Sequence, residues 1–185
     1  MRNRVLTAIL VLCFAAPLLA ATLAGITMPD SITVAGKTLA LNGMGVRSKF
    51  IIKVYVGGLY VEQKSGDPNA ILASDSVKRL LLHFIYSEVS KEQMAEAWAE
   101  GFTNNLPDKG KGLKAQIDQF VGAAEAMKKN EQMMVTYVPG TGTTLTLRGK
   151  DKLTIAGADF GRAVFGIWLG PKPPSNGLKT GLLGK

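Results

Sequence analysis

Residues 42–62 read NGMGVRSKFIIKVYVGGLYVE, and this stretch determines the architecture that we expect. From residue 49 onward it is rich in β-branched and aromatic residues, which favour strands. Gly57 and Gly58 interrupt the run, and an interior glycine often marks a bulge. We therefore predict one long strand over residues 49–62, bent at the two glycines and preceded by a turn at residues 42–45.

Further strands are predicted on both sides of this stretch. Residues 32–41 alternate around Gly36, which predicts a hairpin at the edge of a sheet. Asp67-Pro68 opens a short helical turn, and residues 78–86 (KRLLLHFIY) form a strand apolar enough to be buried on both faces. Residues 132–138, 143–148 and 152–155 form a meander, because the segments between them have hairpin-turn chemistry.

Helices are predicted between and after these strands. Ser90 and Gln93 form a capping-box pair, and an apolar stripe follows at every fourth residue: Met94, Trp98, Phe102 and Leu106. A second helix is expected over residues 113–127. A last one, capped by Asp159, ends at Gly170-Pro171. The order of strands, helices, strands and helix predicts an α+β protein with helices packed on one face of an antiparallel sheet.

The first twenty residues have the layout of a secretory signal peptide. A basic start with Arg2 and Arg4 precedes an apolar run, and small residues follow at Ala20 and Ala21. We therefore expect residues 1–20 to be a signal peptide and residues 21–185 one domain. The protein would be periplasmic or secreted, with no stable membrane span after cleavage.

The composition excludes several classes of protein. The 185 residues contain 22 Lys and Arg against 14 Asp and Glu, a net charge of +8. The basic residues are spread through every segment without a stripe of interleaved aromatics, so no nucleic-acid partner is expected. One Cys and one His exclude a Cys/His zinc cage, and cleavage would remove Cys13. We expect no metal and no cofactor, and the sequence leaves the oligomeric state open.

Two residues stand out as candidates for chemistry. His83 is the only imidazole. Because it lies in an apolar strand, we interpret it as a hydrogen-bonded core histidine rather than as a general base. Arg47 enters an apolar strand near Tyr55, and a partly buried guanidinium needs an acceptor. A ligand carboxylate would serve, and so would an internal salt bridge; a snorkelling surface arginine is the third possibility.

Three separated motifs resemble the chalcone isomerase-like superfamily, most closely its exported bacterial branch. They are NGMGVR at residues 42–47 with KVYVGGLY at 53–60, IWLG at 167–170, and LKTGLLG at 178–184. The resemblance implies the chalcone isomerase fold, an open-faced β-sandwich with a large antiparallel sheet covered by helices. It also implies a ligand cleft between sheet and helices, with Arg47 at the polar end.

The family contains both enzymes and binding proteins. In the plant isomerases the equivalent arginine steers the substrate, whereas in plastid fatty-acid-binding relatives an arginine and a tyrosine hold the lipid carboxylate. The isomerase pattern is poorly kept here. Tyr55 replaces a threonine, and Met94, Gly101 and Ile167 fall at or near a tyrosine, an asparagine and a threonine. Loss of such donors costs several kcal/mol of transition-state stabilisation.

The leading hypothesis is therefore a non-catalytic exported protein that binds a small apolar carboxylate resembling a fatty acid. Arg47 would pair with the carboxylate, Tyr55 would donate a hydrogen bond, and Met94, Trp98 and Phe102 would line the cleft. No catalytic residue is assigned. The alternatives are an isomerase acting on a chalcone- or enone-like substrate, and a structural or partner-binding envelope protein.

Overall fold

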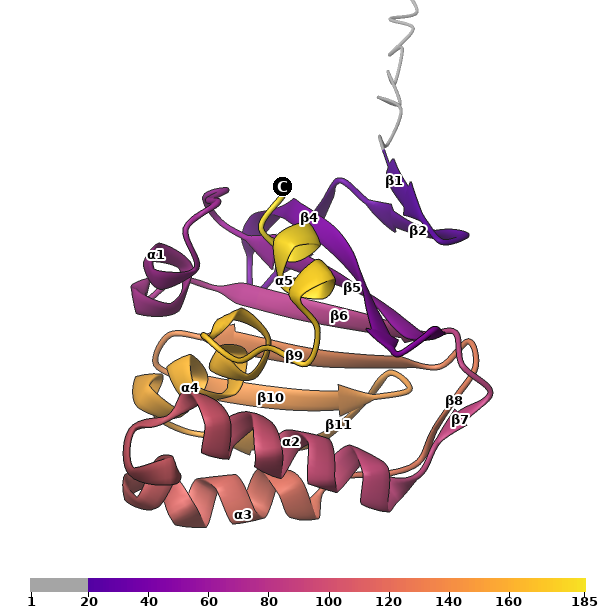
Figure 1. Ribbon diagram of the computed structural model, residues 1–185. Coiled ribbons are helices and arrows are strands. Elements are labelled where there is room, and N and C mark those ends of the chain that lie inside the picture. Colours follow the sequence, from indigo (N-terminus) through magenta and orange to yellow (C-terminus); the bar gives the residue numbers. More distant parts are fainter. Residues whose placement is uncertain (1–19) are drawn as a thin grey trace, which may run out of the picture.

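Seven strands form one curled antiparallel sheet at the centre of the molecule (Figure 1). The computed structural model describes residues 20–185, so the predicted signal peptide lies outside the described residues apart from Ala20. The strand order is β11-β10-β9-β6-β5-β4-β3. The bounds are β3 Ser31–Val34, β4 Lys37–Lys49, β5 Ile52–Val61, β6 Lys78–Phe84, β9 Gln132–Val138, β10 Gly142–Leu147 and β11 Lys150–Ile155. Two separate two-stranded sheets are present: the hairpin of β1 Ala20–Leu23 with β2 Ile26–Pro29, and the pair of β7 Glu88–Val89 with β8 Met127–Lys128, which are far apart in the sequence.

The predicted edge hairpin and meander are confirmed. β3 and β4 turn at Ala35 and Gly36, whose φ angles of 48° and 75° suit a two-residue hairpin loop. Arg148 and Gly149 have φ angles of 52° and 75° and join β10 to β11 in the same way. In both hairpins the sequence between the strands specifies the turn, so local chemistry is enough to predict them.

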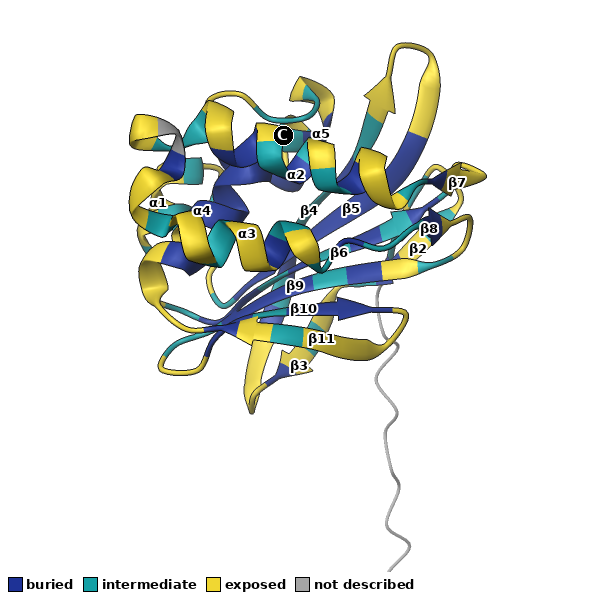
Figure 2. Ribbon diagram, turned by 90° about the horizontal axis from the view of Figure 1, so that it is seen from below, coloured by how far each residue is buried: buried dark blue, intermediate teal, exposed yellow. Residues whose placement is uncertain are grey.

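Helices cover one face of the sheet (Figure 2). They are α1 Pro68–Ala73, α2 Lys91–Asn105, the 3-10 helix η1 Pro107–Leu113, α3 Lys114–Gly122, α4 Ala158–Leu169 and α5 Asn176–Leu182. The Ser90–Gln93 capping box begins α2 as predicted. The predicted second helix ends at Gly122 rather than at residue 127, and α4 is capped by Gly157, with Asp159 inside its first turn. Between residues 20 and 185, no helix is both long and apolar enough to cross a bilayer.

Two apolar cores lie on opposite faces of the sheet. The larger core fills the space between the sheet and the helices and includes Trp98, Phe120 and Trp168. The smaller core surrounds Met28, Val56 and Tyr60 on the other face, where the β1–β2 segment contributes Met28. The two faces of the sheet therefore differ in their covering, one by helices and one by a hairpin.

The glycines of residues 42–45 do not form the predicted turn, because these residues lie inside β4. A Cβ atom on Gly43 would stand 2.1 Å from the carbonyl oxygen of Gly181, and one on Gly45 would stand 2.3 Å from that of Leu178. Both distances are impossible for real atoms. The glycines therefore allow the backbone of α5 to lie directly on β4, and α5 itself was not predicted.

The bulge predicted at Gly57 and Gly58 is not formed, and the single strand predicted over residues 49–62 is interrupted by a turn at residues 50–51. Both glycines pair regularly with β6, and the irregularities in the β4–β5 ladder fall at Asn42 and Val54 instead. A Cβ atom on Gly58 would stand 2.3 Å from the sulfur of Met28. This glycine makes room for the smaller core rather than for a bulge.

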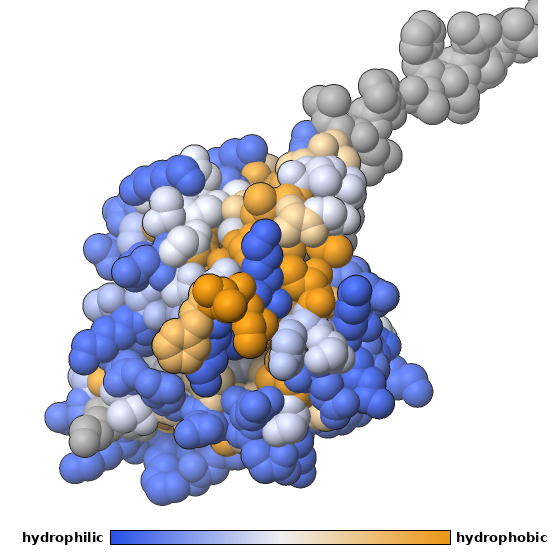
Figure 3. All heavy atoms as spheres, turned by 45° about the vertical axis from the view of Figure 1, so that its right-hand side comes forward, coloured by the Kyte–Doolittle hydropathy of each residue, from blue (hydrophilic) through white to orange (hydrophobic). Residues whose placement is uncertain are grey.

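The turn between β4 and β5 carries the three most exposed of the large apolar side chains among the described residues. Phe50 is 93% exposed, Ile51 96% and Ile52 44%. Figure 3 shows apolar side chains gathered on this side of the molecule, with hydrophilic side chains around and between them. Residues 50–52 therefore present apolar side chains to solvent on a molecule whose surface is otherwise largely hydrophilic in this view.

Candidate functional site

Arg47 is placed by the alternation of side chains along β4. Successive residues point to opposite faces of a strand, so Gly43, Gly45 and Arg47 all face the helices. α5 covers the two glycines, which makes Arg47 the next position on this face with a side chain. Its cross-strand partner in β5 is Tyr55. The guanidinium carbon lies 5.6 Å from the centre of the Tyr55 ring, within range of a cation–π interaction.

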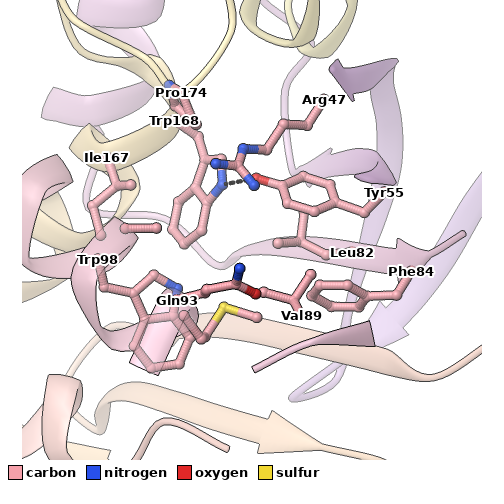
Figure 4. A pocket seen from close by; sticks show the side chains of 12 residues that line it. Arg47, Tyr55, Leu82, Phe84, Val89, Gln93, Trp98, Ile167, Trp168 and Pro174 are labelled. Atoms are coloured by element: carbon pink, nitrogen blue, oxygen red, sulfur yellow. Dashed lines mark hydrogen bonds between the residues drawn. The ribbon is translucent and has the colours of Figure 1, made fainter. Parts of the chain in front are cut away.

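Tyr55 carries a hydroxyl group into the buried side of this pair. The oxygen accepts a hydrogen bond from Trp168 Nε1 at 2.9 Å, shown as the dashed line in Figure 4. Burial raises the pKa of the Tyr55 hydroxyl, while the nearby Arg47 charge and the Trp168 hydrogen bond act in the opposite direction. The phenol therefore stays protonated at neutral pH, and its O–H remains able to donate to a ligand.

The Arg47 guanidinium has an unused donor. Its Nε atom is buried and has no hydrogen-bond partner among the described residues. Arg47 also takes part in none of the ion pairs found between residues 20 and 185. Within the described residues, the internal salt bridge considered from the sequence is thus not formed, and the Nε–H group is left without an acceptor. A buried donor left unpaired costs about 1–3 kcal/mol.

A small cavity opens below Arg47 and Tyr55, between the sheet and α2 and α4 (Figure 4). Its volume of about 30 Å³ holds one or two water molecules. Pockets for small ligands usually measure about 300–1,000 Å³, so a fatty acid would need the lining side chains to move apart. Met94 is the most adaptable of them, because its unbranched thioether chain has several rotatable bonds. The cavity is lined by Arg47, Tyr55, Leu82, Phe84, Val89, Gln93, Met94, Ala97, Trp98, Ile167, Trp168 and Pro174.

A wider groove of about 370 Å³ lies beside this cavity. It runs between the β4–β5 turn and α2, and Arg47, Val89, Gln93 and Ala97 line both hollows. A ligand lying in the groove would therefore reach Arg47 from the outside. A larger hollow of about 800 Å³ lies over α4 and η1, and none of the predicted site residues lines it.

Four of the five predicted site residues meet at the cavity: Arg47, Tyr55, Met94 and Trp98. Phe102 does not. Its ring packs against Phe120 and Phe160, each at 6.0 Å between ring centres, one helical turn further into the core. Trp168 was missed, although a buried indole N–H needs an acceptor and could have been suspected of facing a polar site.

Two of the positions at which the isomerase pattern is missing border the same cavity, and a third lies behind it. Met94 and Ile167 are part of its lining, and a Cβ atom on Gly101 would stand 2.6 Å from Ile167. Neither an apolar side chain nor a glycine supplies a side-chain donor for a hydrogen bond to a substrate. Within the cavity, the polar groups that remain are those of Arg47, Tyr55, Gln93 and the two tryptophans.

His83 lies outside the site and is not a core residue. It is half-buried on β6, where the neighbouring Leu82 and Phe84 are the ones that belong to the larger core. Its Nδ1 atom lies 3.3 Å from Gln132 Nε2. The prediction of a hydrogen-bonded histidine is therefore correct and that of a core position is wrong. Among residues 20–185, no three His, Cys, Asp or Glu side chains come together in a way that could hold a metal ion.

Comparisons with known proteins agree with this fold. The family model described as chalcone isomerase-like matches residues 20–184. A fatty-acid-binding protein of Arabidopsis thaliana has a similar structure, with a TM-score of 0.70 at 16% sequence identity. The alignment covers 89% of this chain and 96% of the plant protein. No curated protein matches the chain in sequence.

Proposed function

The chain belongs to the chalcone isomerase-like family, and we propose that it is an exported, non-catalytic member that binds a small apolar carboxylate resembling a fatty acid. The observation that carries the proposal is the buried, unpaired Nε atom of Arg47, whose guanidinium carbon lies 5.6 Å from the centre of the Tyr55 ring. Charge-assisted hydrogen bonds from a guanidinium to a carboxylate are among the strongest in proteins. The similarity in fold to a plant fatty-acid-binding protein supports the choice of ligand class.

The remaining polar groups fit a carboxylate better than an enone. The Arg47 guanidinium supplies positive charge and N–H donors, and the protonated Tyr55 hydroxyl supplies a further donor. The other lining side chains are largely apolar, which suits an acyl chain. An isomerase would need further donors where Met94 and Ile167 stand. The layout of residues 1–20 supports export as part of the proposal.

The proposal predicts that Arg47 distinguishes a fatty acid from its methyl ester. Delipidated protein should bind palmitate at least tenfold more tightly than methyl palmitate, because only the acid carries a charge. Arg47→Ala should bind palmitate about tenfold less tightly, a loss of about 1.4 kcal/mol, and should no longer prefer the acid. Titration calorimetry measures both ligands with both proteins.

Lys53→Ala provides the matched control. It removes one positive charge from the same hairpin, but Lys53 is exposed and lines neither hollow, so its preference for the acid should be unchanged. An Arg47→Ala variant that still prefers the acid would contradict the site. Turnover of chalcones by the wild-type protein would contradict the non-catalytic assignment. Native mass spectrometry of protein purified from its own host reports both the mass of a bound lipid and that of the mature chain.

A further inference from the structure

The turn between β4 and β5 projects beyond the helices as a free hairpin (Figure 2). We define the hairpin tip as residues 49–53, which read Lys-Phe-Ile-Ile-Lys. All five are exposed, and Phe50 and Ile51 are exposed to more than nine-tenths. Large apolar side chains in contiguous exposed positions mark interaction surfaces more often than isolated ones do.

The hairpin tip also has a conformation and an exposure to solvent that are energetically unfavourable in the isolated molecule. Phe50 has a φ angle of +55°, a left-handed conformation that costs a residue with a side chain about 1 kcal/mol or more. Its ring belongs to neither apolar core of the described residues. Neither the strained backbone nor the exposed ring is therefore offset by packing within residues 20–185. A contact outside the molecule would bury both the ring and the neighbouring Ile51.

The charges at the hairpin tip indicate what that contact is. Lys49 and Lys53 flank the three apolar residues on either side, and both are exposed. Apolar side chains that enter the acyl region, together with ammonium groups at the level of the phosphates, are the arrangement by which proteins bind anionic bilayers. A stable protein interface needs about 20–30 residues on each side, far more than this projecting tip offers.

We propose that the hairpin tip docks on the surface of an anionic lipid bilayer, with Phe50 and Ile51 inserted and the two lysines among the lipid phosphates. Glu96 and Glu100 line the α2 side of the adjacent groove and oppose this attraction, so the lysines and the apolar residues together must provide the binding. The groove would then open at the bilayer surface beside Phe50 and Tyr86. That entry route for a ligand rests on the proposed function, whereas the docking does not.

Vesicle binding tests the docking without any fatty acid. Delipidated protein is sedimented with large vesicles of phosphatidylcholine alone, or of phosphatidylcholine with about 30 mol% phosphatidylglycerol. The second kind of vesicle has a negative surface potential that attracts lysine side chains. We expect at least tenfold stronger binding to the anionic vesicles, weakened by high salt. Equal binding to both, or none, overturns the proposal.

Two variants and one control locate the contact. Phe50→Gly/Ile51→Ser should bind anionic vesicles at least tenfold less, and glycine suits the positive φ at residue 50, so the turn is kept. Lys49→Glu/Lys53→Glu should also lose at least tenfold. Lys37→Glu/Lys64→Glu makes the same change of charge at exposed residues near the opposite end of the β4–β5 pair, and it should lose less than threefold. Equal losses in the two charge-reversed proteins overturn the proposal.

A direct readout separates insertion from adsorption and from self-association. In Phe50→Trp the added indole emission should shift to the blue when anionic vesicles are added; vesicle binding without that shift overturns the proposal. Dimers that disappear in Phe50→Gly/Ile51→Ser, with no vesicle binding by the wild type, would show a contact between copies instead. Protein that binds vesicles but no palmitate contradicts only the proposed function, and protein that binds palmitate but no vesicles contradicts only the docking.

Discussion

Asn42 connects three segments of the chain through its side-chain amide. Its Nδ2 atom donates to the carbonyl oxygens of Ser65 at 3.0 Å and Leu182 at 2.8 Å, and its Oδ1 atom accepts from the Ser65 amide at 2.8 Å. It lies at the β4 irregularity, where the ladder to β5 skips one residue. The side chain of this bulged residue thus links the loop after β5 and the end of α5 to the sheet through hydrogen bonds.

We predict that Asn42→Ala lowers the free energy of unfolding by about 2–4 kcal/mol, because three hydrogen bonds are lost and their partners are partly buried. Asn42→Asp should be at least as harmful at pH 7, since a carboxylate would face two carbonyl oxygens. Its deficit should shrink toward pH 4, where the protonated group can donate again. Urea denaturation measures all three proteins.

The control for this prediction is Asn69→Ala. Asn69 is exposed in α1, and an exposed substitution of this kind usually changes stability by less than about 0.5 kcal/mol. An Asn42→Ala protein as stable as Asn69→Ala would show that the amide hydrogen bonds contribute nothing net.

At the scale of whole elements, close approach of backbones explains where α5 lies. A Cβ atom on Gly181 would stand 2.3 Å from the carbonyl oxygen of Met44, so glycines are needed on both sides of the α5–β4 contact. Local sequence does not predict α5, because two glycines in NGLKTGL disfavour a helix in isolation. Packing against β4 overrides that preference.

Two glycines in α4 should respond in opposite ways to the same substitution. A Cβ atom on Gly161 would stand 2.6 Å from the Tyr137 ring, whereas one on Gly166 would meet nothing within 4 Å. We predict that Gly161→Ala costs about 1–3 kcal/mol through overpacking. Gly166→Ala should stabilise by about 0.5–1 kcal/mol, because alanine favours the helix. Thermal unfolding followed by circular dichroism compares the two, and a shift of both melting temperatures in the same direction would contradict the prediction.

The elements predicted correctly are those specified by neighbouring residues. The Ser90–Gln93 box, the hairpin at Ala35-Gly36 and the β9–β11 meander each depend on contacts within a few residues. Two of the errors concern glycines whose neighbours are far away in sequence. The glycines of residues 42–45 predict a turn until α5 is known to cover them, and Gly58 predicts a bend until Met28 is known to lie above it.

At the scale of the whole molecule, the candidate site could be predicted only in part, because some of its contacts join residues that are far apart in the sequence. Arg47 and Tyr55 lie within one hairpin, so the strand pattern predicts that they are neighbours. Met94 and Trp98 are one helical turn apart, so the helical pattern places them on the same face. The Trp168 hydrogen bond to Tyr55 spans 113 residues and follows from no local pattern. Phe102 continues the same stripe as Trp98, but the helix carries it past the cavity into the aromatic core.

The stability of the whole molecule should depend on pH through buried groups. Burial lowers the pKa of Lys78 to about 8, with Asp75 opposing the shift and Arg162 adding to it. Its Nζ atom donates to the carbonyl oxygens of Ile71 and Ser74 at the end of α1. The unfolded chain keeps this lysine charged up to about pH 10.5. Between pH 8 and pH 10 the unfolded chain thus binds more protons, and stability should rise by about 2 kcal/mol as the pH increases.

At higher pH, two buried tyrosines should make the stability of the protein fall as the pH increases. Burial and the charge of Asp30 raise the pKa of Tyr60 to about 12, and burial with the Asp75 hydrogen bond does the same for Tyr137. The unfolded chain releases these protons near pH 10, so stability should fall above that value. Chemical denaturation should give a maximum near pH 10. Lys78→Met should remove the rise below pH 10, and Lys64→Met, at an exposed site, should keep it; a flat profile in the wild type would refute the assignment.

The contact between β4 and α5 also bears on when the protein can fold during its synthesis. Asn42 and Leu182 are 140 residues apart and lie near the two ends of the described chain. A ribosome adds about 5–20 residues per second, so on the order of ten seconds pass between the two. Until then α5 does not cover the glycines of β4, and the larger core lacks Leu178 and Leu182. The contact between β4 and α5 therefore cannot form until residue 182 has been synthesised, which leaves time for other factors to engage the nascent chain before it folds.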